Sequence, residues 1–512
     1  MERFSEKVYL QLKMPTEEVS VSDEKRIRLA LETLGYQSVT LPLKVLRKLY
    51  PLCRNANFDI TVSLVSADGH WIITDVEAGD TRAHHYGLAV DYGSTTIVMA
   101  LIDMNSGSVI DQAKAVNGQV AFGTDILTRI TYAMEDSANM AQLQRATVQT
   151  FDALLSELAE RTGIDTSRCA AMVLSGNTTM IHFLLQLDAW TVFASPYSPV
   201  VTDPGFYTGR ELGMAFDGMV YIIPAASNYI GGDIISGLLT LDLHKQEQPR
   251  MFFDIGTNGE LVIGNKDWMM AGAGAAGPAL EGYISRFGMR AAPGAIDSVK
   301  IEGDVLSFTT IGNQKPVGIC GSGIIDLLAQ MRINGWINIA GELEPGASSR
   351  IEYLEGEYAA VYALAEESAT GHPLYFSQTD IMQYLDTKAA AYTMVECLME
   401  SAGVEFEALQ HLYLSGAFTA HSDLESAITI GIFPDLPRQK YSVITNTSLA
   451  GARCLLLDRS LLQEAKELVE NMYCVQFASV PDFLVRMQAA KFIPHTDMSR
   501  YPSIQRQLKN GI

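Results

Sequence analysis

The chain has 512 residues, and its 48% of hydrophobic and 19% of charged residues are typical of an ordered globular protein with about two to four domains. Its net charge of −22, from 59 acidic and 37 basic residues, repels a phosphate backbone, so we expect no nucleic-acid partner. No stretch of about 18 apolar residues lacks charge, and residues 1–15 hold no apolar core of a signal peptide. We therefore expect a cytoplasmic protein without a membrane span.

The six cysteines exclude several kinds of site. None lies in a C-x-x-C pair, and their spacings match neither a zinc site nor an iron–sulfur site. Reduced thiols are the expected state in a cytoplasmic protein. The sequence therefore predicts no bound iron–sulfur cluster.

Residues 1–86 predict a small α/β module. Residues 7–14 and 58–65 alternate between apolar and polar side chains like strands. Residues 22–35 and 41–53 have helical patterns. The joint to the next region contains His84 and His85. Because no further ligand residues follow at metal-binding spacing, we expect both histidines to be solvated.

From Gly87 the pattern changes to strand, tight turn and strand, up to Asp103. A helix follows, whose apolar residues recur at i, i+3, i+4 and i+7: Phe151, Leu154, Leu155 and Leu158. Residues 170–185 then read as a strand, a glycine turn and a helix start.

The same order of elements begins again after a polar break. Residues 251–264 repeat the strand, turn and strand, and residues 411–431 repeat the strand–glycine–helix unit. The Leu-Ser-Gly turns Leu174–Gly176 and Leu414–Gly416 correspond in the same way. The chain therefore predicts a tandem duplication, with one half at 87–245 and the other at 246–512.

Each half carries a hairpin in which an aspartate ends the first strand and glycine with small polar residues follows. Glycine lets backbone N–H groups approach phosphate oxygens, and the hydroxyl and amide side chains add donors. Asp91 and Asp254 would repel a phosphate unless Mg²⁺ stood between them. Two such hairpins predict a clamp on the phosphates of ATP, formed by Asp91, Gly93, Ser94, Thr95 and Thr96 and by Asp254, Gly256, Thr257, Asn258 and Gly259.

Other residues are candidates around this clamp. The loop Gly318–Gly323 leads into an apolar run, so Gly321, Ser322 and Gly323 either bind the nucleotide or form an ordinary helix entry. Further carboxylates could orient water or hold metal waters, or could be structural: Asp125, Asp233 and Glu260.

Residues 272–277 satisfy G-x-G-x-x-G, but the preceding segment is a poor strand and Pro278 suits the first turn of a helix. We therefore do not expect a dinucleotide site here, and we expect a helix mouth that lines the cleft.

These motifs resemble those of the acetate and sugar kinase/Hsp70/actin superfamily. Asp91–Thr96 is similar to its first phosphate motif, Asp254–Glu260 to its second, and Leu414–Phe418 to its adenosine motif. The resemblance implies two actin-like, ribonuclease H-like halves around a nucleotide cleft. It also implies that Gly416, Ala417 and Phe418 lie along the adenosine.

Longer stretches resemble the reductive activators of corrinoid proteins, over most of the chain. They include FGTDILTRI, SNYIGGDIISGLL, AAGPALEGYISRFGMRAAPGAI, VGICGSGIIDLL and NTSLAGA. The resemblance implies ATP-dependent return of an inactive Co(II) corrinoid protein to Co(I). We expect the loop Glu281–Arg290 to contact the corrinoid partner, where Ser285 could offer an oxygen ligand or a hydrogen bond. Members of that family usually carry an iron–sulfur domain ahead of this region, so a separate iron–sulfur protein would supply the electron here.

Two other functions on the same fold stay open. A small-molecule kinase would use a carboxylate such as Asp125 or Asp233 to activate a substrate hydroxyl. A nucleotide switch would bind ATP without turnover. Assembly as a homodimer also stays open.

Overall fold

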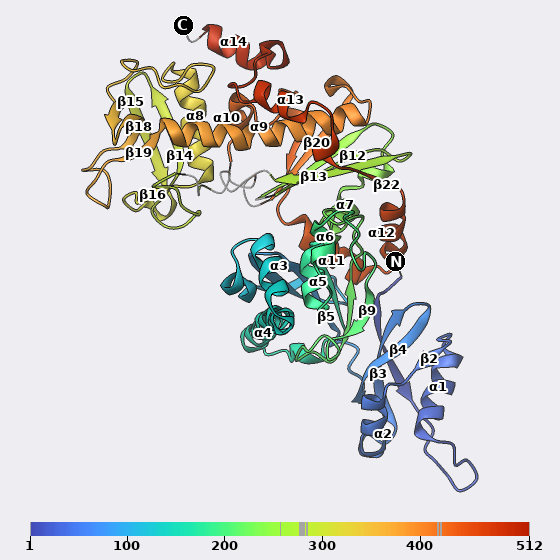
Figure 1. Ribbon diagram of the computed structural model, residues 1–512. Helices are drawn as coiled ribbons and strands as arrows, with labels where there is room; N and C mark the ends of the chain where they lie inside the picture. The colour runs from blue at the N-terminus through green and yellow to red at the C-terminus, as the bar shows by residue number, and fades with distance from the viewer. Residues whose placement is uncertain are drawn as a thin grey trace. The chain divides into compact units, whose positions relative to one another are not determined.

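The computed structural model describes residues 2–256, 258–275, 282, 285–416, 419 and 422–510, and the chain divides into two compact units (Figure 1). Unit 1 comprises Met1–Asp242 and Thr447–Asn471, and unit 2 comprises Leu243–Asn446 and Met472–Ile512. The stretch Thr447–Asn471 therefore belongs to unit 1, although it follows most of unit 2 along the chain.

Unit 1 begins with the small α/β module. Its four-stranded sheet has the order β1-β3-β4-β2, with β1 (Ser5–Gln11), β2 (Val39–Thr40), β3 (Asp59–Ala67) and β4 (His70–Ala78). Helices α1 (Asp23–Thr33) and α2 (Leu43–Asn55) pack on this sheet through buried apolar side chains. In α2 the buried Val45, Leu49 and Cys53 recur every four residues, which is the stripe that a helix on a sheet requires.

The second part of unit 1 is a six-stranded sheet with the order β7-β6-β5-β8-β10-β9. Its strands are β5 (Tyr86–Tyr92), β6 (Thr96–Asp103), β7 (Val109–Val116), β8 (Ala171–Gly176), β9 (Gly205–Thr208) and β10 (Met219–Ile222). Its helices are α3 (Ile126–Glu135), α4 (Ser137–Thr162), α5 (Thr178–Leu184), α6 (Trp190–Phe193), α7 (Gly232–Leu241), α11 (Thr447–Leu457) and α12 (Ser460–Glu470). The apolar stripe predicted in this half lies on α4, whose Phe151, Leu154 and Leu158 are buried in the core beneath the sheet.

Unit 2 contains a matching six-stranded sheet with the order β21-β20-β11-β12-β13-β22. Its strands are β11 (Arg250–Ile255), β12 (Asn258–Gly264), β13 (Met269–Ala275), β20 (His411–Ser415), β21 (Tyr441–Val443) and β22 (Met472–Val475). Two three-stranded sheets add β14 (Ala295–Glu302), β15 (Val305–Thr310), β16 (Gly318–Ile319), β17 (Ile351–Leu354), β18 (Glu357–Ala363) and β19 (Leu374–Ser377). The helices are α8 (Gly321–Ile333), α9 (Gln378–Ser401), α10 (Leu424–Ile430), α13 (Phe483–Ala490) and α14 (Pro502–Asn510).

The two six-stranded sheets share one topology. In unit 1, β5, β6 and β7 form an antiparallel meander, and β8 and β10 extend it in parallel from β5. In unit 2, β11, β12 and β13 form the same meander, and β20 and β21 extend it from β11. The predicted α/β class with duplicated halves after a small module is confirmed.

Two local expectations were wrong. The segment before the G-x-G-x-x-G run is a genuine strand, β13, and its Gly272 and Gly274 lie inside it. β-Carbons at these positions would lie 2.5 Å from the Phe477 ring and 2.6 Å from the Met394 sulfur, so close packing explains both glycines. Pro278 and its expected helix lie outside the described residues.

The second correction concerns the joint after the module. His85 is 1% exposed, and its Nε2 lies 2.9 Å from the Ser5 hydroxyl, so it is a core residue and not a solvated one. His84 is exposed.

Candidate functional site

Asp91 lies near the end of β5, on the side of the strand opposite the apolar core. Leu88, Val90 and Tyr92 point into the core beneath the sheet, so by strand alternation Asp91 points to the other face, where α11 packs on β5 and β8. The Ser448 hydroxyl on α11 donates to Asp91 Oδ1 at 2.8 Å. The half-buried carboxylate is therefore held at a fixed place beside the glycine loop.

The loop after β5 is held to the protein through its carbonyl groups. Its carbonyl groups turn toward the protein: Asn117 Nδ2 donates to Gly93 O at 3.0 Å, Arg129 Nη1 to Ser94 O at 2.7 Å, and the Asn117 N–H to Thr95 O at 2.8 Å. Because C=O and the following N–H point in opposite directions across a trans peptide, the N–H groups of Ser94 and Thr95 turn outward. Outward N–H groups on successive residues can bind an anion.

Gly93 is required by the turn itself, because a β-carbon there would lie 2.5 Å from the Thr96 carbonyl oxygen. Thr96, the first residue of β6, is exposed.

Arg129 places a positive charge beneath this loop. Its side chain is fully buried, and its contacts are carbonyl oxygens, including Gly123 O at 2.8 Å. Burial lowers the pKa of the guanidinium below its usual value, but an arginine stays charged in proteins. Among the residues that the structure describes, no carboxylate lies within ion-pair distance of Arg129. The charge therefore favours an anion at the loop.

The second hairpin places Asp254 in the corresponding position. Asp254 is half-buried on β11, opposite Glu260 on β12 and beside Ser415 on β20. In unit 1 the matching neighbour of Asp91 is Ser175 on β8. The two carboxylates therefore occupy equivalent positions of the duplicated sheet.

The turn after β11 is tight and partly described. The Gly256 N–H donates to Asn258 O at 2.8 Å, and a β-carbon on Gly256 would meet only that oxygen, at 3.8 Å. Thr257 lies outside the described residues, and Asn258 is exposed. Gly259 packs against Met394, whose terminal carbon would lie 2.9 Å from a β-carbon. Among the described residues, Gly259 is therefore closely packed and Gly256 is not.

In each half, the glycine of the Leu-Ser-Gly turn packs against the residue that follows the strand-end aspartate. A β-carbon on Gly176 would lie 3.0 Å from Tyr92 O, and one on Gly416 would overlap Ile255 O. Gly416 also has a φ of +102°, which favours glycine. Ala417 and Phe418 lie outside the described residues. Close backbone packing accounts for both glycines, with or without a nucleotide.

The residues Gly321, Ser322 and Gly323 form the first turn of α8 and are buried. The Ser322 hydroxyl donates to Asp297 O at 2.9 Å, and a β-carbon on Gly323 would overlap Ile296 O. This turn is therefore packed against β14, in agreement with the helix-entry alternative. Its relation to a nucleotide stays a prediction.

The remaining carboxylates have local partners. Asp125 caps α3: its Oδ1 accepts the Thr128 N–H at 2.8 Å and its Oδ2 accepts the Thr128 hydroxyl at 2.7 Å. The bond from the Thr128 N–H holds the pKa of Asp125 below its usual value. By starting α3, Asp125 places Arg129 beneath the loop. Asp233 is half-buried in the first turn of α7, and its Oδ1 accepts the Ile234 N–H at 3.0 Å.

Asp91 and Asp254 suit a magnesium ion, which takes most of its ligands from water and phosphate, better than a metal ion whose ligands all come from the protein. Within the described ranges, no three His, Cys, Asp or Glu side chains come close enough to hold a metal ion. Mg²⁺ needs only one or two carboxylates, because water and substrate phosphates complete its octahedron. A single carboxylate beside a phosphate loop is therefore an adequate donor set.

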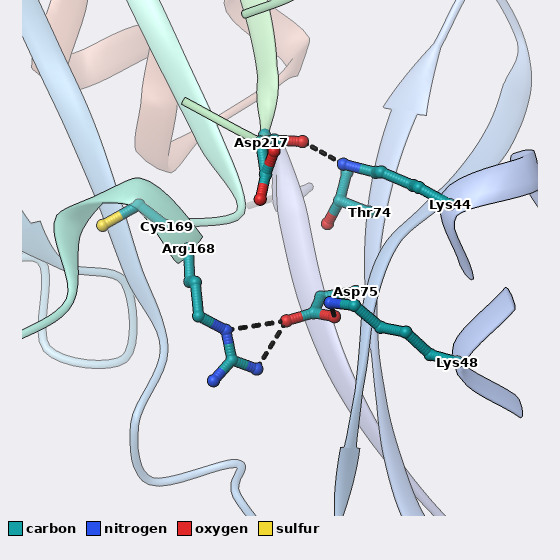
Figure 2. Close-up of a pocket in the computed structure, with 8 residues that line it drawn as sticks. Lys44, Lys48, Thr74, Asp75, Arg168, Cys169 and Asp217 are labelled. Atoms are coloured by element: carbon teal, nitrogen blue, oxygen red, sulfur yellow. Dashed lines mark hydrogen bonds and ion pairs between the residues drawn. The ribbon is translucent and has the colours of Figure 1, made fainter. Parts of the chain in front are cut away.

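A small cavity in unit 1 has a different character. It has a volume of about 90 Å³ and lies between the module and the first six-stranded sheet (Figure 2). The buried Asp75 on β4 pairs with Lys48 of α2 at 2.9 Å, and with Nη2 of Arg168, in the short helical turn Thr166–Arg168 before β8, at 2.6 Å. Lys44 of α2 donates to Asp217 O. Because each of these cations is already bonded to oxygen, the cluster joins the two parts of unit 1 and is not an anion site.

Reasoning from sequence missed the residues that support the loop and Asp91. Ser448 and Arg129 lie within stretches that resemble the family, but no motif assigned them a role. In the sequence, Arg129 is only an arginine three residues after an apolar position, and Ser448 is only a serine in a helix of small residues. Neither pattern is specific for a supporting role. No helix among the described residues is both long enough and apolar enough to span a bilayer.

Three family models cover nearly the whole chain. Residues 1–83 match the RACo linker region, residues 86–246 the RACo middle region, and residues 248–505 the C-terminal domain of RACo, the ASKHA domain. The solved structure of a reductive activator for corrinoid, iron–sulfur protein superposes with a TM-score of 0.88 and 34% identity, over 98% of this chain and 81% of that one.

Two curated proteins are similar along most of their length. The corrinoid activation enzyme RamQ of Eubacterium limosum is 28% identical over 430 residues, which is 82% of this chain and 72% of that protein. The [Co(II) methylated amine-specific corrinoid protein] reductase of Methanosarcina barkeri is 24% identical over 420 residues, 76% of this chain and 73% of that protein. Together with the duplicated sheets, these matches establish that the chain belongs to the RACo family.

Proposed function

We propose that this protein is an ATPase that reductively activates a corrinoid protein, returning Co(II) to Co(I) so that the corrinoid accepts a methyl group again. The observation that carries the proposal is the likeness to a reductive activator over 98% of the chain. The two strand-end aspartates with their glycine turns add a chemical reason, because they are suited to a nucleotide. The expected place of action is the cytoplasm.

Each hairpin is a proposed contact for ATP. The outward N–H groups of Ser94 and Thr95, with the hydroxyls of the same loop, bind phosphate oxygens, and the buried charge of Arg129 strengthens that binding. Asp91 and Asp254 would hold a Mg²⁺ ion, which would neutralise the charge that develops on the phosphates. Asp125, Asp233 and Glu260 are the proposed carboxylates for orienting the attacking water, and Asp125 also caps α3.

The coupling to the partner is conformational. Binding of ATP changes the protein's grip on the corrinoid protein, and a grip that favours reduced cobalt by ~3 kcal/mol raises its one-electron potential by roughly 130 mV. The electron comes from a separate iron–sulfur protein.

The loop Glu281–Arg290 is the proposed contact with the corrinoid protein. Ser285 in this loop is buried, whereas Arg286 is exposed, pairs with Glu355 and donates to the Tyr375 hydroxyl at 2.9 Å. These bonds anchor the middle of the loop on the β17–β18 turn and on β19. Glu281, Tyr283 and Ile284 lie outside the described part of the chain.

The test is ATP hydrolysis measured with and without a purified Co(II) corrinoid protein, together with the visible spectrum of cobalt. We expect the corrinoid protein to stimulate hydrolysis, and ATP with a low-potential donor to produce Co(I). Stimulation by a small alcohol and not by the corrinoid protein would identify a kinase instead. Binding of ATP with no turnover under either condition would identify a nucleotide switch.

A further inference from the structure

Three serine hydroxyls form a buried cluster next to Asp91. Ser175 on β8 and Ser236 on α7 are fully buried, and Ser448 on α11 is 7% exposed. Ser175 Oγ and Ser448 Oγ lie 2.9 Å apart, and Ser236 Oγ donates to Ser448 O at 2.6 Å. The cluster therefore joins three elements of unit 1 to one carboxylate.

The direction of the hydrogen bonds follows from the number of protons. A serine hydroxyl has a single proton, and an ionised carboxylate only accepts, so the Ser448 proton is used in the 2.8 Å bond to Asp91 Oδ1. Ser175 Oγ lies 2.9 Å from Ser448 Oγ and 3.1 Å from Gly232 O, and both oxygens can only accept, so the single Ser175 proton is shared between these two acceptors. Ser448 is thus both oriented by Ser175 and committed to Asp91.

The position of Ser448 is set by close contact between α7 and α11. A β-carbon on Gly451, one turn after Ser448, would overlap the Ser236 carbonyl oxygen. The absence of a side chain at Gly451 lets the two helices approach until Ser236 reaches the Ser448 backbone. Along the chain, three residues separate the end of β21 in unit 2 from the start of α11, so the helix that holds Asp91 is covalently joined to the second sheet.

We propose that Ser448 is a positioning residue for Asp91, and that its hydroxyl fixes the rotation of the carboxylate that faces the nucleotide's Mg²⁺. The inference rests on the proposed ATP function. A hydrogen bond to one carboxylate oxygen sets the direction of the other, and partners of metal-facing carboxylates strongly influence metal affinity. Without the hydroxyl, the carboxylate would lose this constraint, and part of the metal-binding free energy would be lost in ordering it.

The experiment measures binding of a nonhydrolysable ATP analogue by titration calorimetry at a series of Mg²⁺ concentrations. For Ser448→Ala we expect the Mg²⁺ concentration for half-maximal enhancement to rise by about 10- to 100-fold. Nucleotide affinity without Mg²⁺ should stay within about twofold, because the loop N–H groups are untouched. Ser448→Thr, which keeps the hydroxyl, should restore the wild-type Mg²⁺ dependence.

Ser5→Ala is the matched control, since it removes another buried serine hydrogen bond of 2.9 Å in unit 1, to His85. It should lower the melting temperature and leave the Mg²⁺ dependence unchanged. If Ser448→Ala does not fold, Ser175→Ala is the second variant, and a smaller rise in the Mg²⁺ requirement is expected.

An unchanged Mg²⁺ dependence in the folded serine variant would overturn the inference. Wild-type protein that binds no nucleotide at any Mg²⁺ concentration would instead refute the proposed function.

Discussion

Replacing Gly416 by alanine should disturb unit 2 more than its backbone conformation alone predicts. The residue has a φ of +102°, and a β-carbon there would overlap the carbonyl oxygen of Ile255, the residue after Asp254. Gly403 has a φ of +64° in the same unit, but a β-carbon there meets nothing within 4 Å. Comparing the two alanine variants therefore separates the clash from the strain of a left-handed conformation.

The expected losses of stability in Gly403→Ala and Gly416→Ala differ about threefold. A left-handed alanine costs about 1 kcal/mol, which lowers the melting temperature of a unit of this size by about 2–4 °C. The clash with a backbone oxygen adds about 2 kcal/mol, since backbone cannot rotate away as a side chain can. We expect Gly416→Ala to lower the transition by about 6–12 °C.

Thermal melting followed by circular dichroism measures the stability, and calorimetry measures binding of a nonhydrolysable ATP analogue. Gly416→Ala should also weaken nucleotide binding, because relief of the clash must move the end of β11 that carries Asp254. Gly403→Ala should bind as the wild type does. Equal melting temperatures for the two variants would refute the packing argument at this turn.

Three further predictions follow from particular contacts. Asp254→Ala should abolish ATP hydrolysis while circular dichroism stays native; undiminished turnover would contradict its role at Mg²⁺. Lys388, fully buried on α9, donates to three carbonyl oxygens, those of Ala490, Phe492 and Pro494, so Lys388→Met should destabilise the C-terminal segment by about 3–5 kcal/mol, seen as early proteolysis there. Burial raises the pKa of Asp75, but hydrogen bonds from Lys48 and Arg168 outweigh it and hold that pKa below 3.8. The free energy from this pair is therefore present above pH 3.8 and lost as the pH falls below it, and Asp75→Asn should flatten the acid-induced fall in melting temperature; an unchanged profile would show that the junction is not held by this charge.

The duplication was predictable because its signal is local and occurs twice. An apolar strand that ends in aspartate and glycine can be read from about ten residues, and so can the Leu-Ser-Gly turn. The sheets then place Asp91 beside Ser175 and Asp254 beside Ser415, as tandem halves require.

The support of the site was not predictable, because it depends on contacts between distant segments. Ser448 lies 357 positions from Asp91, and nothing in the sequence indicates that α11 packs on the first sheet. The burial of Arg129 beneath the loop could not be predicted either, since a buried arginine and an exposed one look alike in a helix pattern. The strand β13 was missed for a different reason: glycines weaken a strand pattern, and here they serve to accommodate Phe477 and Met394.

The most direct test of the account is a crystal structure with a nonhydrolysable ATP analogue and Mg²⁺. We expect phosphate oxygens within hydrogen-bond distance of the Ser94 and Thr95 N–H groups, and Mg²⁺ waters bonded to the carboxylates of Asp91 and Asp254. A nucleotide bound away from both hairpins would contradict the account.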